Sequence, residues 1–452
     1  MKHKKLWFSV LVLALGMISA VSTFAQDRKI LTLQEAIQLS IRNSKQLKIS
    51  QAKIEQATAS TKEAEDRRLP EASASASYLR LNKPNVNMQT KTNPNGGGTG
   101  SPGTTPAHPS QAAYTMVNAS LPLYSGLRIK YGIASAKYLE QATKLDADKN
   151  REEVVMNTVN AYNNFYQSRA ALDLVKESLA DAQQRVKELT RQEQNGLIAR
   201  NDLLRAQLQA SNTELSLLDM EKNWSLAALQ MNLLLGLPEN TQLVPDSSSM
   251  QISTDLKGVD EYVQLALQNR SDLAALDYRK KAADAGVKIA EGEKLPSVAL
   301  TSGYVAMDVP KVLTVTNAVN LGIGVQYNIS SLWKNKAKVQ SAKAQEKQLE
   351  FSQDLLSDAV RLEVNQAYQN YLVSRKKIEV QATAVEQASE NYKVVKNKFT
   401  NGLATVADLL DADEAQQQAR LNQSTAQSDA TIAYNRLLQA AGILSNSITN
   451  TK

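Results

Sequence analysis

The stretch Asn195-Gly196-Leu197 interrupts a long helical pattern, and it recurs 206 positions later as Asn401-Gly402-Leu403. Asn-Gly favours the left-handed backbone that ends an α-helix, and the following leucine can fold back onto the last helical turn. Apolar residues repeat in heptads on both sides of the first triplet. One row contains Phe165, Leu172, Leu179 and Val186 before it, and Leu203, Ala210, Leu217, Trp224 and Met231 after it. The pattern predicts an antiparallel coiled-coil hairpin at each triplet.

An internal repeat organises the rest of the chain. Ala161-Tyr162 aligns with Ala367-Tyr368 at the same offset as the two triplets, whereas the earlier Leu69-Pro70 aligns with Leu295-Pro296 at a larger offset. The change of offset indicates an insertion in the first half, for which the loop 82–110 is the obvious place. The chain is therefore predicted to be a tandem duplication, with one repeat over 26–236 and the other over 237–452.

The N-terminal segment 1–25 has the pattern of an export signal. Three lysines precede an apolar run over 6–21, and a small-residue cleavage site ends at Ala25. A membrane anchor is the alternative, but the apolar run is shorter than the ~20 residues that a spanning helix needs. We expect the segment 1–25 to be removed on export.

Composition argues against several functions. The chain has no cysteine, and its two histidines are His3 in the signal and His108 in a Gly/Pro-rich loop. The glycine-rich segment 95–100 lacks the Lys-Ser/Thr ending of a phosphate-binding loop. Removal of the three signal lysines lowers the formal net charge from +7 to +4. We therefore expect no enzyme activity, no metal, no cofactor and no nucleic-acid partner.

The periodicity changes from helical to alternating in four segments, near 71–81, 113–123, 296–307 and 319–329. Each has roughly ten residues, which is the length of a tilted strand that crosses a bilayer. Small polar residues on the second face suit a wet lumen. Two ordinary hairpins on a soluble core are the alternative. Aromatic residues near the strand ends suggest an interfacial girdle: Tyr78, Tyr124, Tyr304, Tyr327 and Trp333.

Long helices are expected around these strands. One helix should open at Thr32, which has capping-box spacing to Glu35, and continue to about Arg68. Helix should resume near Gly126 and near Leu332 and run to each Asn-Gly-Leu triplet. About 68 residues at ~1.5 Å per residue give a rod on the order of 100 Å.

Four strands are too few to close a barrel in lipid. An open sheet edge leaves backbone groups unpaired in the bilayer, and single-chain barrels begin at about eight strands. The chain must therefore share strands with copies of itself. The expected fold class is mainly α with a transmembrane β-barrel part, built from two repeats that each contain a β-hairpin and long coiled-coil helices.

The chain resembles the TolC-like outer-membrane efflux family over essentially its whole mature length. The matching features are Leu121-Pro122-Leu123-Tyr124-Ser125-Gly126, the two Asn-Gly-Leu triplets and Asp408-Leu409-Leu410. The resemblance implies a homotrimer in the outer membrane, with a twelve-stranded β-barrel continued by a periplasmic α-helical barrel. It also implies a passive channel for efflux or type I secretion, which docks onto a periplasmic adaptor (a membrane fusion protein) and an inner-membrane transporter of RND or ABC type.

The sequence departs from the family pattern in two places. Lys45 and Ser271 stand where family members often have proline, and Leu127 replaces a common second glycine after Gly126. Neither departure affects the expected fold.

The resemblance also implies roles for residues near the triplets. Residues 195–197 and 401–403 would meet the adaptor, although both triplets could be helix caps alone. Asp408 and Asp411 would form acidic rings at the periplasmic aperture, with Asp202 as the counterpart in the first repeat. The alternative for Asp408 is a capping role with Thr405. Arg200, beside the first triplet, could pair with an aspartate.

A periplasmic coiled-coil adaptor, scaffold or adhesin is the rival class. An adaptor should show one coiled-coil hairpin beside lipoyl-like and β-rich segments. Two equivalent hairpins and four strands of membrane length weigh against it. The nature of the substrate (drug, metal, peptide or protein) stays open.

Overall fold

A computed structural model describes residues 29–82, 109–246, 256–310 and 312–445. The expected export signal, the glycine-rich segment 95–100 and His108 lie outside these ranges. The chain divides into two compact units. We call them the tip unit (Met1–Ile49, Lys149–Arg270 and Ala359–Lys452) and the sheet unit (Ser50–Asp148 and Ser271–Asp358).

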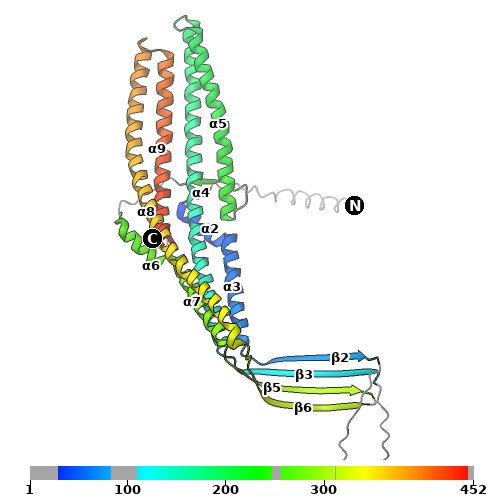
Figure 1. Cartoon of the computed structure of the whole chain (residues 1–452). Helices are drawn as coiled ribbons and strands as arrows, with labels where there is room; N and C mark the ends of the chain where they lie inside the picture. The colour runs from blue at the N-terminus through cyan, green and yellow to red at the C-terminus, as the bar shows by residue number, and fades with distance from the viewer. Residues whose placement is uncertain (1–28, 83–108, 247–255, 311, 446–452) are drawn as a thin grey trace, which may run out of the picture. The chain divides into compact units, whose positions relative to one another are not determined.

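Two helical hairpins dominate the tip unit (Figure 1). The first joins α4 (Arg128–Gln194) to α5 (Arg200–Leu235), and the second joins α8 (Ser331–Thr400) to α9 (Val406–Ala440). Both turn at the predicted Asn-Gly-Leu triplets, which confirms the hairpin prediction. The N-terminal parts of α4 and α8 belong to the sheet unit.

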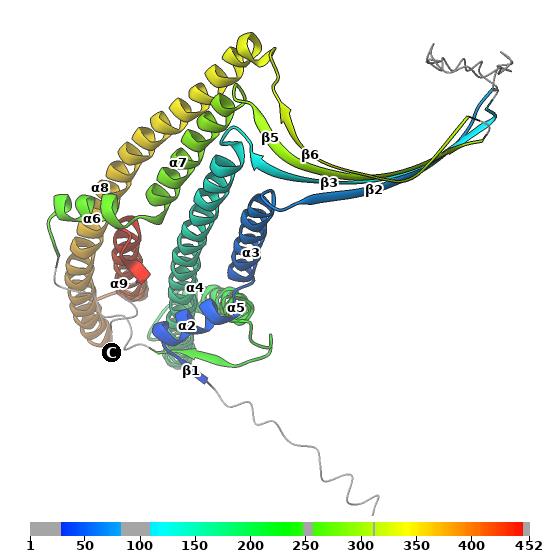
Figure 2. The same cartoon turned by 90° about the horizontal axis from the view of Figure 1, so that it is seen from below.

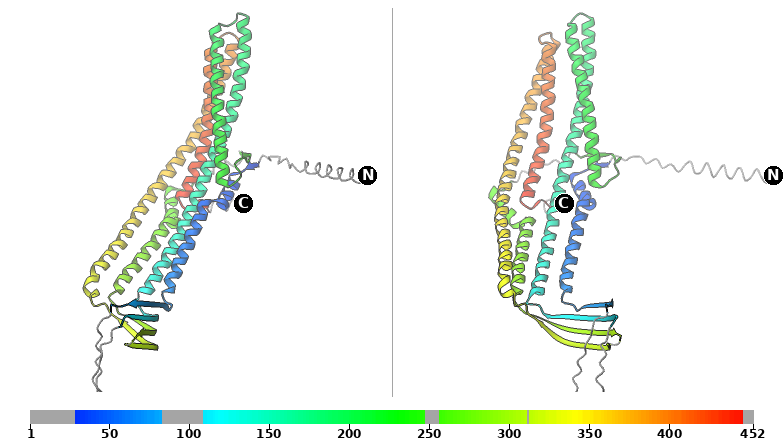
Figure 3. Two further views of the ribbon diagram at one scale, coloured as in Figure 1. Left: turned by 90° about the vertical axis from the view of Figure 1, so that its right-hand side faces the viewer. Right: turned by 45° about the vertical axis from the view of Figure 1, so that its right-hand side comes forward.

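Side-chain contacts join neighbouring helices of the tip unit in three pairs: α4 with α5, α4 with α9, and α8 with α9. Phe165 of α4 stacks on Trp224 of α5 with ring centroids 4.6 Å apart. Asn163 of α4 accepts a hydrogen bond from Ser428 of α9 at 2.9 Å. Tyr371 of α8 packs on Tyr434 of α9 at 5.2 Å between ring centroids. In the view of Figure 1, α8 and α5 lie on the two outer sides of these four helices, and the right-hand view of Figure 3 agrees.

The predicted heptad seam is confirmed. Phe165, Leu172, Leu203 and Met231 are buried, and the remaining seam positions of α4 and α5 are buried or half-buried. On α9 the seam is made of alanines, so the helices can approach closely. The buried ones are Ala412, Ala419, Ala426 and Ala440.

Short elements close the base of each hairpin. Helix α2 (Leu33–Asn43) serves the first hairpin, where the Asn43 amide donates to the Leu235 carbonyl at 2.6 Å. Helix α6 (Val259–Asn269) precedes Arg270, which pairs with Glu363 of α8 at 2.6 Å. Strands β1 (Lys29–Leu31) and β4 (Leu243–Pro245) pair in parallel beside α2.

The prediction of one helix from Thr32 to about Arg68 is wrong. Thr32 does cap α2, but the chain leaves the helical conformation at Ser44, where ψ is 121°. The Ser44 hydroxyl then accepts from the Leu47 backbone N–H at 3.3 Å, which starts α3 (Lys45–Asp66). The second repeat breaks in the same way, between α6 and α7 (Ser271–Gly292). Lys45 and Ser271 are thus first helical residues, where proline is tolerated.

The sheet unit contains a four-stranded antiparallel sheet in the order β2-β3-β5-β6, which is curved (Figure 2). Its strands are β2 (Glu71–Arg80), β3 (Gln111–Tyr124), β5 (Ser297–Val309) and β6 (Leu313–Gln326). All four predicted strands are present. The bounds predicted for the last one are wrong, because β6 begins at Leu313 rather than Val319 and Ile329 lies beyond its end. The chain turns there, since the Ser331 backbone N–H donates to the Asn328 carbonyl at 3.0 Å.

Cross-strand register gives the sheet one apolar and one polar face. Val319 pairs with Tyr304, Tyr304 with Val117, and Val117 with Ala74. The adjacent row consists of small polar residues or glycine: Asn320, Gly303, Asn118 and Ser73. Side chains of one row point to one face because successive residues of a strand alternate. The alternation predicted for single strands therefore extends across the whole sheet.

The junction between β3 and α4 is a close backbone crossing within the sheet unit. Gly126 has a φ of +62°, and a Cβ there would lie 2.5 Å from the Gly292 carbonyl oxygen. Leu127 has a φ of 66° at the position where the family resemblance leads one to expect glycine. A leucine in the left-handed region is strained by about 1–2 kcal/mol. The fold accommodates this strain, so leucine in place of glycine at position 127 does not change the architecture.

Within the ranges that the structure describes, no helix is long and apolar enough to cross a bilayer.

Candidate functional site at the hairpin tips

The two tips have nearly identical backbone geometry. Gly196 and Gly402 have φ values of +72° and +71°. The Leu197 N–H donates to the Gln192 carbonyl at 2.8 Å, and the Leu403 N–H donates to the Lys398 carbonyl at 2.8 Å. Both leucines are highly exposed, at 73% and 77%. Each tip is therefore a tight helix stop that presents one large apolar side chain to its surroundings.

The tips differ in how the next helix begins. At the second tip, Thr405 and Asp408 form a capping box. The Asp408 carboxylate accepts from the Thr405 backbone N–H at 2.8 Å and from its hydroxyl at 2.7 Å. At the first tip the equivalent cap residue is Ala199, which makes no side-chain cap. The carboxylates of Asp202 and Asp408 thus have different local roles.

The capping role expected as the alternative for Asp408 is present in the structure. The Thr405 backbone N–H, followed by the Thr405 hydroxyl, lowers the pKa of the Asp408 carboxyl. Asp411 lies one turn further along α9 and is exposed. Arg200 approaches Glu193 across the first tip at 3.9 Å, so within one chain its acidic neighbour is a glutamate rather than the aspartate that the sequence suggested.

Below the tips, a small apolar cluster joins the two hairpins. Leu189, Leu203 and Ala206 of the first hairpin pack with Val406 of the second. The half-buried Ile198 and Phe399 lie against it. The tips are therefore held together within one chain by the side chains that flank them.

A buried ion pair lies further from the tips. Arg185 of α4 donates to the Asp413 carboxylate of α9 at 2.9 Å and to the Tyr392 hydroxyl of α8 at 3.3 Å. Gln417 donates to the same carboxylate at 3.0 Å and accepts from Ser178 at 2.7 Å. We call these five residues the polar clamp. It links both hairpins across their seam.

Burial works against the charge of Arg185, but its partners outweigh the burial. Desolvation lowers the pKa of the guanidinium, whereas the hydrogen bond and the charge of Asp413 raise it, and the net change is upward. Sequence reasoning missed the clamp. Its signal was a charged residue at position 185, in the buried row that also contains positions 178, 182 and 189.

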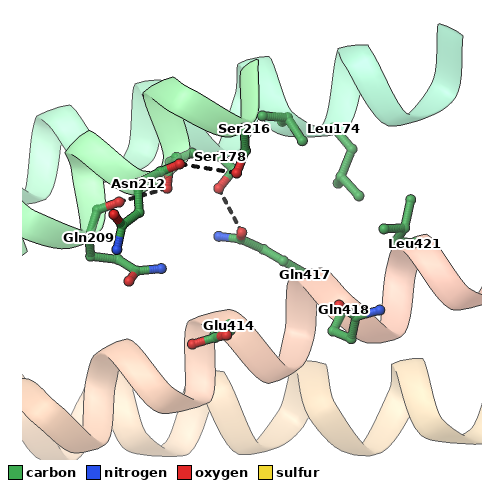
Figure 4. Close-up of a pocket in the computed structure, with 11 residues that line it drawn as sticks. Leu174, Ser178, Gln209, Asn212, Ser216, Glu414, Gln417, Gln418 and Leu421 are labelled. Carbon is green, nitrogen blue, oxygen red and sulfur yellow. Dashed lines mark hydrogen bonds between the residues drawn. The ribbon is translucent and has the colours of Figure 1, made fainter. Parts of the chain in front are cut away.

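A polar groove of about 330 Å³ lies beside the clamp, between α4, α5 and α9 (Figure 4). Its lining is mostly amide and hydroxyl groups, with Glu414 as the charged member. Ser178 and Gln417 of the clamp point into it from opposite sides. The lining is able to hydrogen-bond water or a polar segment, but it brings no acid and base together. The other lining residues are Leu174, Val175, Gln209, Asn212, Thr213, Ser216, Gln418 and Leu421.

The five girdle residues do not lie at one level of the sheet unit. Tyr124 ends β3, Tyr327 directly follows β6, and Trp333 lies in the first turn of α8. Tyr78 lies near the opposite end of the sheet, where its hydroxyl donates to Gln111 at 2.8 Å. Tyr304 lies inside β5, which continues beyond it to Val309. The girdle role of these five residues stays a prediction.

No group of acidic side chains or histidines suited to a metal ion occurs among the residues that the structure describes.

Comparison with solved structures defines the class of protein. The fold matches the outer-membrane channel OprN with a TM-score of 0.75 and 17% identity, covering 91% of this chain and 89% of that one. It matches the outer membrane protein VceC of Vibrio cholerae with a TM-score of 0.73 and 19% identity, covering 91% and 96%. The outer membrane channel MtrE of Neisseria gonorrhoeae matches with a TM-score of 0.71 and 16% identity, covering 91% and 89%. The fold is that of the TolC-like outer-membrane channels.

Sequence comparison gives the family. The model of the family described as "Outer membrane efflux protein" matches residues 36–237 and 262–443. A curated relative, outer membrane efflux protein BepC of Brucella suis biovar 1 (strain 1330), is 23% identical over 323 residues, which is 71% of this chain and 70% of BepC. The chain belongs to the outer membrane efflux protein family, and its place is the outer membrane.

Proposed function

We propose that this chain is the exit channel of a tripartite efflux or type I secretion system, passive by itself and driven by its partners. Three copies would complete a twelve-stranded barrel in the outer membrane and a helical tunnel in the periplasm. In this proposal the segment 1–25 is removed on export, and the repeats 26–236 and 237–452 each supply one β-hairpin and one tip.

The observation that carries the proposal is the two-faced sheet with open edges. Strands β2 and β6 each pair with one neighbour in the described sheet, so each has a free edge. On β6, Val319, Leu321, Ile323 and Val325 are 68–74% exposed. Lipid is the solvent that favours such a face, whereas free backbone groups at an edge are costly in lipid.

Strand direction permits the sheet to continue from copy to copy. The four strands alternate in direction, so β6 of one copy can pair with β2 of the next and keep the antiparallel pattern. Every copy adds an even number of strands, and three copies exceed the eight or so that a closed barrel needs. The row of Asn, Gly and Ser would then face the lumen, and the row with Val319 and Val117 would face lipid.

Fractionation and mass measurement test this assembly. The full-length protein should sediment with the outer membrane, run as a heat-sensitive trimer in mild detergent, and give a mass of three chains by native mass spectrometry. A stable, water-soluble single copy in the absence of detergent would overturn the proposal and favour a periplasmic scaffold.

We also propose that the tips dock onto the periplasmic adaptor. Leu197 and Leu403 are highly exposed and lie at the ends of rigid hairpins, a geometry suited to contact with a helical hairpin of a partner. A photo-crosslinking amino acid placed at either leucine in cells should capture a periplasmic protein through peptides of its coiled-coil segment. The control is Leu139 of α4, which is also exposed but lies far from the tips in sequence. Equal capture at all three positions would count against tip docking.

At the aperture, we expect the acidic residues to have different roles. The Asp408 carboxylate is held in the cap, whereas Asp202 and Asp411 are not engaged by a cap residue. Copies of these carboxylates around one axis would attract cations and repel one another, which opposes tight closure. Arg200, next to the first tip, would moderate that repulsion.

Planar-bilayer recordings with divalent cations test the aperture. Asp202→Asn and Asp411→Asn should each weaken cation block. The double variant Asp408→Ala with Asp411→Ala should weaken it at least as much. Block that is unchanged in all of these variants would leave Asp408 with its capping role alone.

A further inference from the structure

The junctions between helices and strands of the sheet unit all lie at one end of the sheet (Figure 1). Helix α3 leads into β2, β3 into α4, α7 into β5, and β6 into α8. The register agrees, since Glu71 at the start of β2 is opposite Ser120 near the end of β3, and Ser297 at the start of β5 is opposite Gln326 at the end of β6. We call this end of the sheet, together with the adjoining helix ends, the base.

Basic residues occupy the base in repeat-related pairs. The pairs are Arg68 with Lys294, Arg128 with Lys334, and Lys130 with Lys336. All six side chains are exposed. None of them makes an ion pair within the ranges that the structure describes. We call these six residues the basic collar, and both repeats contribute to it equally.

A large apolar residue stands directly beside a collar residue at each of the four junctions. These apolar residues are 40–64% exposed, and they too form repeat-related pairs. They are Leu69 with Leu295, and Leu127 with Trp333. Apolar and basic side chains side by side are typical of the boundary between hydrocarbon and headgroups, because the stem of a Lys or Arg lies along apolar groups while its charge reaches the polar layer.

The acids near the base do not cancel the charge of the collar. Glu65 pairs with Lys137 at 2.7 Å, and the repeat-related Glu291 pairs with Lys343 at 3.2 Å. Both acids are thus engaged by lysines that lie further along α4 and α8 than the collar. The acids of the base without an ion pair in the described part of the chain are Asp66 and Glu71. Basic groups are therefore in excess at the base.

Arg128 lies at the close backbone crossing between the start of α4 and the end of α7. Its Nε donates to the Ser125 carbonyl at 2.9 Å, and a Cβ on Gly292 would lie 3.4 Å from its Cγ. Lys294 follows Gly292 by two positions, so two collar residues belong to this crossing. The bond from Nε leaves the two terminal nitrogens of the guanidinium available, and their forked geometry suits a phosphate group.

We propose that the basic collar binds the headgroups of anionic phospholipids in the leaflet that faces the periplasm. The inference rests on the proposed placement of the sheet in lipid. The helical part of this family is periplasmic, so the base, where the helices begin, meets that leaflet. Each basic residue that reaches an anionic membrane surface raises the affinity about fivefold. The exposed apolar residues alone would not distinguish anionic from zwitterionic lipid.

Tryptophan fluorescence tests this selection, because Trp333 stands beside Lys334. One of the other two tryptophans lies in the expected export signal, and Trp224→Phe removes the last while keeping an aromatic ring against Phe165. The mature protein with this change is reconstituted in phosphatidylcholine vesicles that contain brominated phosphatidylglycerol or brominated phosphatidylcholine as the quencher. Phosphatidylglycerol should bind about fivefold more tightly at low salt, and the preference should shrink at high salt.

Two double variants and a matched control locate the effect. Arg128→Gln with Lys334→Gln should abolish most of the preference, and Lys130→Gln with Lys336→Gln, which leaves the Arg128 hydrogen bond intact, should lower it as well. The control is Lys137→Gln with Lys343→Gln, which removes the same charge from a repeat-related pair. These lysines lie about 14 Å further along their helices, beyond a headgroup layer of roughly 5–8 Å. The control should keep the preference.

The outcomes separate this inference from the proposed function. Equal quenching by the two brominated lipids would refute the selection and leave the sheet in the bilayer. An equal loss in the control variant would also refute the collar as the site. If inorganic phosphate removed the preference and chloride of the same ionic strength did not, the collar would be a site for free phosphate rather than for lipid. Quenching by neither lipid would refute the placement of the sheet in lipid.

Discussion

The two hairpin tips carry the same triplet and stop their helices in the same way, yet they restart the chain differently. Gly196 and Gly402 have φ values of +72° and +71°, and the leucine amides make the same 2.8 Å bond. After the second tip Thr405 caps α9, whereas Ala199 leaves the start of α5 without a side-chain cap. The two repeats thus share the way in which α4 and α8 end, which the turn requires, but differ in the way in which α5 and α9 begin.

The same asymmetry occurs in the polar clamp. The positions that correspond to Arg185 and Asp413 in the other repeat are Asn391 and Gln207. One buried ion pair therefore joins α4 to α9, and the repeat-related positions have no charged equivalent. The two repeats therefore share their backbone geometry but differ in their charged contacts.

The largest expected effect comes from breaking the clamp on one side. Arg185→Leu leaves the Asp413 carboxylate buried without its partner and should destabilise the helical part by about 3 kcal/mol. Denaturant unfolding of the full-length protein in detergent, followed by circular dichroism in the far ultraviolet, measures it. Arg185→Leu with Asp413→Leu should recover most of the loss, and Asn391→Leu is the repeat-related control. A double variant as unstable as the single one would show that packing, not charge, is responsible.

The tip glycines should respond next and equally. Gly196→Ala and Gly402→Ala each force a side chain into the left-handed region, which costs about 1–2 kcal/mol, although neither Cβ meets a neighbour. Hydrogen exchange of the Leu197 and Leu403 amides reports the local loss. Gly132→Ala within α4, where a Cβ also meets nothing, should be neutral or stabilising. Unequal losses at the two tips would contradict their equivalence.

An exchange of caps sharpens the contrast between the two restarts. Thr405→Ala should weaken the first turn of α9 by about 1 kcal/mol, and Ala199→Thr should strengthen α5, since Asp202 stands at the position of a capping-box acid. Hydrogen exchange in the two first turns provides the readout. If Ala199→Thr left the exchange of α5 unchanged, Asp202 would not be able to act as Asp408 does.

The smallest effect is the acid response of α9. Because the pKa of Asp408 is lowered in the folded chain, its capping contribution is complete above the ordinary aspartate value of 3.8 and is lost as pH falls through the lowered value. Hydrogen exchange of the first turn of α9, corrected for intrinsic rates, should rise below pH 3.8. Asp408→Asn should remove this pH dependence, and a rise that persists in the variant would assign it to another group.

Local patterns predicted much of this architecture, because heptads and alternation report which side of an element is covered. They failed where a single residue changes the path, as at Ser44, and where strand pairing extends an element, as in β6. The polar clamp was hidden for a different reason. Arg185 and Asp413 are 228 positions apart, and no local signal indicates that they meet.

By itself, the sequence determined the duplication, the two helix stops and the alternating strands, because each depends on neighbours within a few turns or residues. The tertiary structure decided which rows stay exposed after the chain has folded. In the sequence, Leu208 and Leu218 of α5 look like ordinary helical leucines, but in the folded chain packing covers the opposite side of the helix and leaves both exposed. Exposure depends on every element that packs nearby, so only the folded chain reveals it.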